Sequence, residues 1–162
     1  MATVPEPFLR QTYPGLNEAE DRLLREYLQR IDEDVVALET QVRVGPGERL
    51  SEAERDSFRR SWQESSKFKI DAVVTTESAI RLVELKDLIR TSYLGQLRSY
   101  RYWYEVERET DKPLELWVVA EDVNPSAVQP GRFDRVNMVL LSAEGQRHFE
   151  QGLEATPPFN SP

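Results

Sequence analysis

Residues 69–86, KIDAVVTTESAIRLVELK, narrow the possible folds of this chain more than any other stretch. Two runs rich in Ile, Val and Leu are separated by Glu77-Ser78, a spacing typical of antiparallel β-strands joined by a tight turn. Both runs also carry charged residues: Lys69, Asp71, Glu84 and Lys86. Charge is costly to bury inside apolar strands. The stretch therefore predicts a core hairpin whose charges have a purpose other than packing.

The surrounding pattern alternates between helical and strand periodicity. A helix is expected from Asn17, which is a suitable N-cap, to about residue 34. The other expected helices are 51–67, 92–109 and 142–152, with Gly152 ending the last one. Besides the hairpin, the expected strands are 35–44, 114–123 and 134–141. This order predicts an α/β fold in which helices flank a mixed central sheet.

The length and composition indicate one domain. Its expected bounds are 16–153, with an insertion at about 46–67 and flexible segments at 1–15 and 154–162. No apolar run approaches the ~20 residues of a membrane span, and there is no basic-then-apolar leader. There are no cysteines, which excludes disulfides, zinc ribbons and iron–sulfur clusters. We therefore expect a cytoplasmic protein without a membrane partner.

The net charge of −8 argues against a general nucleic-acid coat protein, but it leaves room for a local basic groove. Only four of the 21 basic residues are lysine, so a lysine at position 86 stands out. Arginine stays protonated and is a poor substitute for lysine in proton transfer.

The hairpin pattern predicts where its charges meet. With a two-residue turn, Asp71 lies opposite Glu84, and Lys69 lies opposite Lys86; a longer loop shifts this pairing by a position or two. Two adjacent carboxylates raise each other's pKa unless a cation separates them. Mg²⁺ prefers such oxygen ligands, and the backbone carbonyl of Leu85 can add another. The alternative is a structural ladder of ion pairs, Asp71 with Lys86 and Glu84 with Lys69.

Two further features point the same way. Glu20 falls in the middle of the apolar stripe of the first helix, where a carboxylate needs a partner or a cation. Gln96 and Tyr100 are spaced i, i+4 on the helix after Lys86. That helix also carries Arg98 and Arg101 among aromatic residues, a mixture that suits a strand of nucleic acid.

Taken together, these motifs resemble the PD-(D/E)xK nuclease superfamily, whose core is an αβββαβ unit, over about residues 17–123. Asp71 in KIDAVV and Glu84-Leu85-Lys86 in RLVELK match its signature, although Ile70 replaces the usual proline. Glu20 matches the helix glutamate of many members, and Gln96 to Tyr100 match the Q-x-x-x-Y of the RecB-like branch. The cysteines of the iron–sulfur subgroup are absent.

The resemblance implies a restriction-endonuclease-like fold and a DNA nuclease that hydrolyses phosphodiester bonds through a metal-activated water. The implied metal ligands for Mg²⁺ or Mn²⁺ are Asp71, Glu84, Leu85 and Glu20. Lys86 and Gln96 complete the expected catalytic set. The expected substrate-binding residues are Tyr100, Arg98, Arg101 and Lys69. A small acidic protein is also expected to grip DNA with a protein partner or as a homodimer. The alternative is a catalytically silent subunit that uses the same fold for binding or assembly.

Overall fold

The computed structural model describes residues 8–47 and 67–155. The tails 1–7 and 156–162 and most of the helix expected at 51–67 lie outside these residues. The strands are β1 (Val35–Val44), β2 (Phe68–Thr76), β3 (Ile80–Ile89), β4 (Leu114–Val123) and β5 (Val136–Leu140). The helices are α1 (Glu18–Arg30), α3 (Tyr93–Glu107), the 3₁₀ turn η3 (Pro125–Ala127), α4 (Val128–Phe133) and α5 (Ala143–Glu154).

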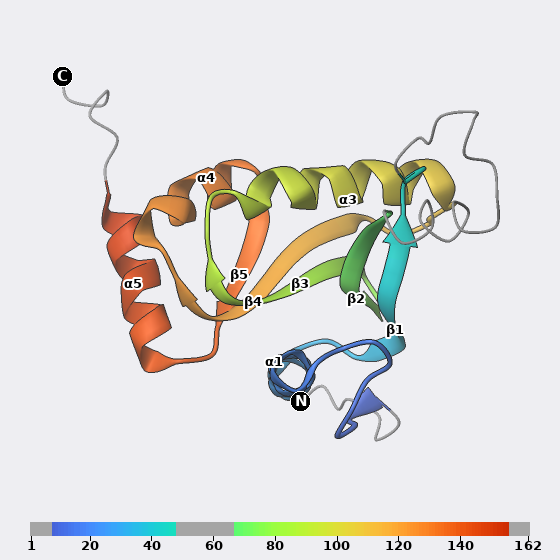
Figure 1. Ribbon diagram of the computed structural model, residues 1–162, viewed down its shortest axis with the longest axis horizontal. Coiled ribbons are helices and arrows are strands. Elements are labelled where there is room, and N and C mark those ends of the chain that lie inside the picture. Colours follow the sequence, from blue (N-terminus) through green and yellow to red (C-terminus); the bar gives the residue numbers. More distant parts are fainter. Residues whose placement is uncertain (1–7, 48–66, 156–162) are drawn as a thin grey trace, which may run out of the picture.

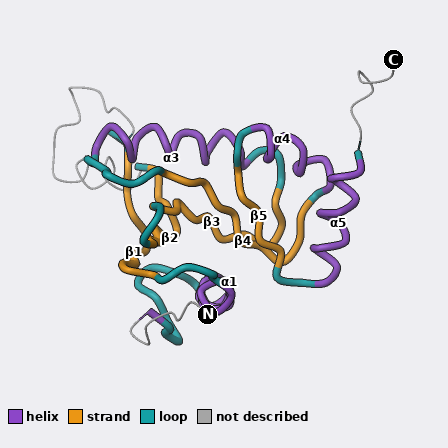
Figure 2. Tube along the Cα trace, turned by 180° about the vertical axis from the view of Figure 1, so that it is seen from behind, coloured by secondary structure: helices purple, strands orange, loops and turns teal. Residues whose placement is uncertain are grey.

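The five strands form one open sheet in the order β1-β2-β3-β4-β5. Neighbouring strands are antiparallel from β1 to β3 and parallel from β3 to β5, so the sheet is mixed, as the sequence predicts. Helix α1 lies on one face of the sheet, and α3 and α4 lie on the other (Figure 1). Helix α5 lies at the end of the molecule away from β1, against the C-terminal part of β4 (Figure 2). The chain is thus an α/β protein with helices on both faces of its sheet.

Two hydrophobic cores fill the space between the sheet and its helices, because alternate strand residues face opposite sides. On β3, Leu82 packs into the core under α3, whereas Val83 and Leu85 pack into the core against α1. Tyr13 also belongs to the α1 core and is only 4% exposed, and its backbone N–H donates to Asp21 at 2.8 Å. Residues 8–15, part of the segment 1–15 that was expected to be flexible, are irregular in conformation but are held by contacts of this kind.

The hairpin register agrees with the pairing predicted for a two-residue turn. Ala72 pairs with Val83, and Thr75 pairs with Ile80. The backbone N–H of Thr76 donates to the carbonyl of Ala79 at 2.9 Å, which closes the turn around Glu77-Ser78. This register brings Asp71 and Glu84 to the same end of the hairpin.

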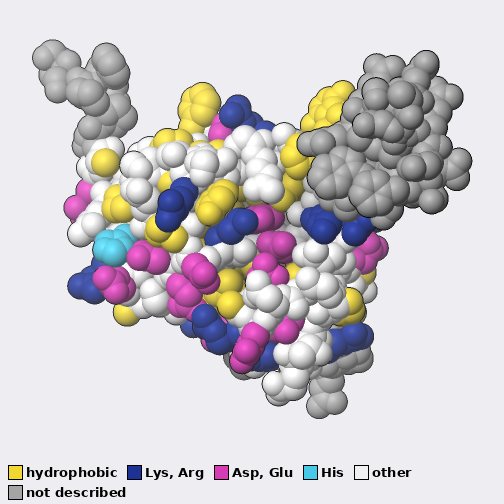
Figure 3. Space-filling view, viewed as in Figure 1, with side chains coloured by type: hydrophobic (Ala, Val, Ile, Leu, Met, Phe, Trp, Pro, Cys, Tyr) yellow, Lys and Arg dark blue, Asp and Glu magenta, His cyan; other side chains and the backbone are white. Residues whose placement is uncertain are grey.

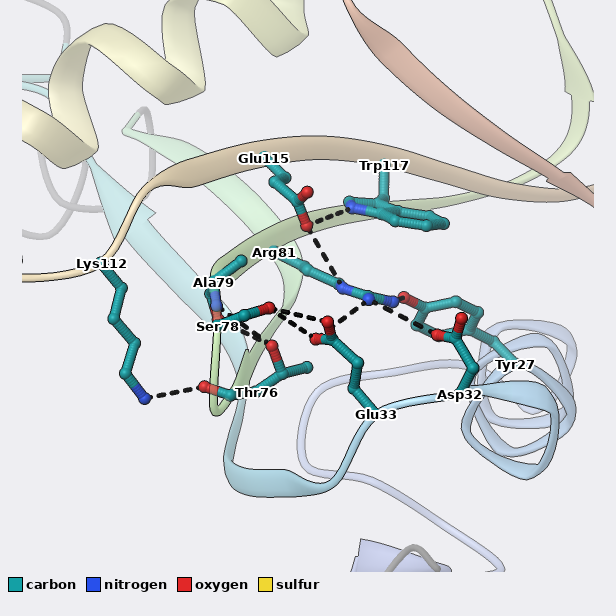
Figure 4. Close-up of polar contacts among 10 residues, drawn as sticks. All are labelled: Tyr27, Asp32, Glu33, Thr76, Ser78, Ala79, Arg81, Lys112, Glu115 and Trp117. Atoms are coloured by element: carbon teal, nitrogen blue, oxygen red, sulfur yellow. Dashed lines mark hydrogen bonds and ion pairs between the residues drawn. The ribbon is translucent and has the colours of Figure 1, made fainter. Parts of the chain in front are cut away.

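Arg81, near the start of β3, is 5% exposed and is the centre of a polar cluster that joins α1, the α1–β1 loop and β4. Its Nη1 donates to the hydroxyl of Tyr27 at 2.8 Å, and its guanidinium lies 4.3 Å from the Trp117 ring centre (Figure 4). Its carboxylate partners are Asp32, Glu33 and Glu115. The sequence pattern gave no indication of this cluster, because its members come from four separate segments.

Two expectations about the C-terminal third are wrong. No helix is expected between the last two strands, yet η3 and α4 lie there and cross from β4 to β5. Gly152 does not end the last helix, because α5 continues to Glu154. Gly152 is buried, and a Cβ there would stand 2.4 Å from Val128 Cγ2 and 2.7 Å from the Pro125 carbonyl oxygen. The glycine therefore permits close packing rather than a helix stop.

This contact predicts opposite effects of alanine at two helical glycines. Gly152→Ala should lower the free energy of unfolding by about 1–3 kcal/mol, because the added methyl group overlaps its neighbours. Gly95→Ala should raise it by up to about 1 kcal/mol, because no atom lies within 4 Å of a Cβ at that position. Urea unfolding measures both values, and effects of the same sign would contradict the packing described here.

In the described residues, 8–47 and 67–155, none of the helices combines the length and apolar character needed to cross a membrane.

Candidate functional site

The candidate site begins where β2 and β3 separate. Their pairing ends at Ala72 and Val83, and the next pair along would be Asp71 and Glu84. Here the backbone N–H of Leu85 donates to Asp71 Oδ2 at 2.9 Å, so a side chain takes the place of a strand partner. The two strands are thereby held slightly apart, with both carboxylates at the opening.

These carboxylates lie in an open hollow of about 520 Å³ whose wall includes residues from the start of α1 and from α3, and which we call the carboxylate hollow. It is lined by Glu20, Gln41, Lys69, Asp71, Glu84, Gln96 and Tyr100, among others. A second hollow of about 320 Å³ includes Leu85, Lys86 and Tyr93 and shares Asn17 and Glu20 with the first. In the view of Figure 3, acidic side chains gather near the middle of the molecule, with basic side chains on either side of them.

Asp71 and Glu84 are both almost fully buried, at 8% and 3% exposure. Burial raises the pKa of Asp71 to about 6, although the hydrogen bond from Leu85 opposes the shift. Burial, followed by the charge of Asp71, raises the pKa of Glu84 to about 8. The site therefore resists carrying two negative charges without a cation nearby.

Lys86 supplies one positive charge. Its Nζ lies 3.0 Å from Glu84 Oε1 and 4.7 Å from the centre of the Tyr93 ring. Burial acts to lower the pKa of Lys86, but the charge and hydrogen bond of Glu84 outweigh it, so the pKa is raised. Lys86 is thus a protonated ammonium group held beside the two carboxylates.

This arrangement is not the ion-pair ladder that the sequence left open. Lys86 pairs with Glu84 on its own strand rather than with Asp71 across the hairpin. Lys69 is exposed on the wall of the carboxylate hollow, and its side chain makes no ion pair with the described residues.

The donor set fits a hard divalent cation in part. Glu84 Oε2 and the Tyr100 hydroxyl are buried, and neither makes a well-formed hydrogen bond within the described residues, although the two groups interact with each other. Buried oxygens that are only weakly paired are costly unless something binds them. Asp71, Glu84 and the Leu85 carbonyl are the oxygen ligands that Mg²⁺ or Mn²⁺ accepts.

Glu20 lies on the wall of the carboxylate hollow, but its carboxylate is hydrogen-bonded to the backbone at the start of α1. It lines both hollows, and its charge helps to raise the pKa of Asp71. Its Oε2 accepts from the backbone N–H of Asn17 at 3.0 Å, which completes a capping box at the start of α1. Within residues 8–47 and 67–155, no three Asp, Glu or His side chains lie close enough to hold a metal. Glu20 therefore does not form a three-carboxylate set with Asp71 and Glu84 in this structure.

The predicted residues of α3 separate onto two sides of that helix. Gln96 and the buried Tyr100 face the carboxylate hollow. Burial, followed by the charges of Glu84 and Asp71, raises the pKa of Tyr100, so its hydroxyl remains protonated. Arg98 and Arg101 lie on the other side: Arg98 Nε is 3.7 Å from Asp134 Oδ2, and Arg101 lines a hollow beside β4 and β5.

Gln41 is a site residue that the sequence pattern missed. Alternation along β1 assigns it to the polar face, yet its Nε2 lies 3.4 Å from Asp71 Oδ1. Its φ of 52° is left-handed, which is uncommon for a residue other than glycine. Gln41 and Asp71 are the positions between the pairs Thr40↔Ala72 and Val42↔Ile70, and the strand register is the same on both sides of them. No signal in a single sequence marks a glutamine for this conformation.

Comparison of the chain with protein-family models, with curated proteins and with solved structures finds no match. The class that the fold defines is therefore the general one, an α/β protein with a five-stranded mixed sheet. Any narrower description depends on the chemistry of the carboxylate hollow.

The raised pKa values predict how pH affects the stability of the metal-free protein. The folded state holds protons on Asp71 and Glu84 that the unfolded chain releases near pH 4, so stability should fall as pH rises from about 4 to 8. Glu84→Gln should remove part of this loss and raise the free energy of unfolding at pH 8 by roughly 2 kcal/mol, with little effect near pH 4. Denaturant titrations in EDTA at several pH values measure this difference.

The exposed hairpin-turn variant Glu77→Gln is the matched control and should keep the pH dependence of the wild type, because Asp71 and Glu84 are unchanged in it. Equal pH profiles for wild type and Glu84→Gln would contradict a strained carboxylate pair.

Proposed function

We propose that this protein is a divalent-metal-dependent DNA nuclease of the PD-(D/E)xK type. The observation that carries the proposal is the buried pair of carboxylates Asp71 and Glu84, with the protonated ammonium group of Lys86 3.0 Å from Glu84. Phosphodiester hydrolysis needs this combination: oxygen ligands for a hard cation and a positive charge where negative charge develops.

Each side chain has a distinct part in the proposed reaction. When bound, Mg²⁺ or Mn²⁺ would stabilise negative charge on the phosphate and make water a better nucleophile at neutral pH. Asp71 and Glu84 would hold the cation together with the Leu85 carbonyl. Lys86 would orient the attacking water and stabilise the charge that develops on the phosphate oxygens.

The wall of the hollow supplies the remaining groups. Gln96 is half-buried at the rim and would orient the substrate or water. Gln41 and the Leu85 N–H would fix the Asp71 carboxylate from two sides, because each contacts a different oxygen. Lys69, exposed on the same wall, would contact a phosphate of DNA. Because the protein is acidic overall, a homodimer or a protein partner would strengthen its binding to DNA.

One observation favours a second candidate, a catalytically silent subunit of a DNA-processing or defence complex. Glu20 is committed to its capping box, so the site has two carboxylates rather than three. In this alternative the fold binds or assembles, and the buried pair is a remnant without turnover.

Metal-dependent cleavage separates the two candidates. Purified protein is incubated with linear, nicked and single-stranded DNA in Mg²⁺, Mn²⁺ or EDTA, and its melting temperature is measured with each ion. The nuclease proposal predicts cleavage that EDTA abolishes, together with stabilisation by the ion, which follows from mass action even if the DNA is unsuitable. No cleavage of any substrate and no stabilisation by either ion would overturn it.

A further inference from the structure

A third hollow, with arginines on its wall, lies on the other side of α3 from the carboxylate hollow. It has a volume of about 570 Å³ and includes Arg101 of α3, Arg132 of α4 and Arg135, which precedes β5. We call it the arginine hollow. Within the described residues, none of these three guanidinium groups makes a hydrogen bond or an ion pair.

The acidic residues of the arginine hollow do not neutralise it. Glu115 is already engaged, because it lies 3.4 Å from Arg81 Nε and accepts from Trp117 Nε1 at 3.3 Å. Glu105, an exposed residue of α3, is the other acidic side chain on the wall. Three unpaired guanidinium groups around an open hollow favour an anion with several oxygens, such as a phosphate.

Phe133 stands on the same turn, between Arg132 and Asp134. It is 89% exposed, the most exposed large hydrophobic side chain in the described structure. In the space-filling view, a hydrophobic side chain projects above α4 beside charged side chains (Figure 3). A phenyl ring without protein neighbours leaves both faces open for stacking.

The turn that presents these groups is well held. The N–H of Asp134 donates to the Pro130 carbonyl and that of Arg135 to the Arg132 carbonyl, both at 3.0 Å, and the Asp134 carboxylate pairs with Arg98. Arg135 has a φ of 57°, a left-handed conformation that glycine or asparagine adopts more easily. An arginine kept in a strained position suggests that its side chain is needed there.

We propose that the arginine hollow and Phe133 bind a single-stranded segment of nucleic acid, with phosphates at the arginines and an unpaired base stacked on Phe133. Aromatic stacking combined with positive charge is the usual means of binding single strands, whereas the bases of a duplex already stack on each other. The inference rests on the proposed function only for the identity of the partner. It places a second nucleic-acid contact across α3 from the carboxylate hollow.

Binding is tested separately from cleavage by working in EDTA. Fluorescence anisotropy of a labelled 20-nucleotide oligo(dT) and of a duplex of the same length is measured for wild type, Phe133→Ala and the double variant Arg132→Gln/Arg135→Asn. Asparagine tolerates the left-handed backbone, so the double variant should keep the wild-type melting temperature. Arg30→Gln, an exposed arginine at the end of α1 on the opposite face of the sheet, is the matched control.

Phe133→Ala should weaken binding of the single strand roughly 5- to 100-fold and change duplex binding less than about twofold. A plot of log K against log salt has a negative slope, and the double variant should make that slope shallower by about 1.4. This is the change expected for two lost phosphate contacts on a single strand. Glu105→Gln should tighten binding, because it removes the free negative charge of the hollow. Arg30→Gln should bind as wild type does.

Unchanged single-strand binding by Phe133→Ala and the double variant would overturn the inference. A change of oligomeric state in Phe133→Ala with DNA binding intact would also overturn it, since Phe133 would then belong to a protein interface. Cleavage by the wild type with unaffected binding by the variants would refute this inference alone. Variant-sensitive binding without any cleavage, and without stabilisation of the protein by Mg²⁺ or Mn²⁺, would refute the nuclease proposal alone.

Discussion

Lys86→Ala should reduce metal-dependent DNA cleavage at least about 100-fold while the protein still binds the metal ion. The ammonium group of Lys86 lies 3.0 Å from Glu84 and is held over the Tyr93 ring, so its position is fixed before substrate arrives. Because this charge is already in place, the protein does not have to rearrange when negative charge builds up on the phosphate. Single-turnover cleavage rates measure the loss, and the Mn²⁺-induced shift in melting temperature measures metal binding.

Two further substitutions test whether the loss is specific to the lysine at position 86. Lys86→Arg keeps the charge but should not restore the rate, because a guanidinium differs in shape and cannot give up its proton. Lys112→Ala removes a lysine at the far end of the hairpin, where it donates to the Thr76 carbonyl, and should cleave as wild type does. Cleavage by Lys86→Ala within about threefold of wild type would exclude Lys86 from the reaction, since a lost electrostatic contact costs far more.

Arg81→Ala should give the largest loss of stability, roughly 3–5 kcal/mol in the free energy of unfolding. The substitution leaves the Tyr27 hydroxyl and the carboxylates of Glu33 and Glu115 without their shared cation at a largely buried position (Figure 4). It also removes the guanidinium from the face of Trp117. Denaturant unfolding at pH 7 measures the effect.

Arg22→Ala is the matched control for this prediction. Arg22 pairs with Glu26 at 3.1 Å and with Glu121, but its side chain is 43% exposed. Water and salt screen such a pair, so the loss should be at most about 1 kcal/mol. Equal losses for Arg81→Ala and Arg22→Ala would show that the buried cluster does not hold α1 to the sheet.

The local elements of the fold could be predicted from the sequence. β1 and β4 begin and end where the alternation of apolar residues does, at Val35–Val44 and Leu114–Val123. The hairpin register is the one predicted for a two-residue turn, although the sequence left a longer loop and a shifted register open. Asn17 caps α1 as expected, because short-range hydrogen bonding determines a helix start.

Features that depend on distant contacts could not be predicted. The tight packing at Gly152 depends on Val128, which lies on another helix. The left-handed Gln41 depends on Gly15 and Asp71, on either side of it in space. The sequence pattern placed Glu20 in the middle of the apolar stripe, but Glu20 is only half-buried and bonds to the backbone of its own N-cap, whereas Asp21 is the buried acidic residue of α1. Pattern alone does not reveal which of several available partners a side chain takes.

The central claim is that Asp71 and Glu84 share a divalent cation beside Lys86. An anomalous difference map from crystals soaked in Mn²⁺ tests it most directly. We expect a peak about 2.0–2.3 Å from oxygens of both carboxylates, a distance typical of small divalent ions bound to oxygen. A fully bound ion at another site with none between Asp71 and Glu84, or no ion at all at millimolar Mn²⁺, would contradict the account.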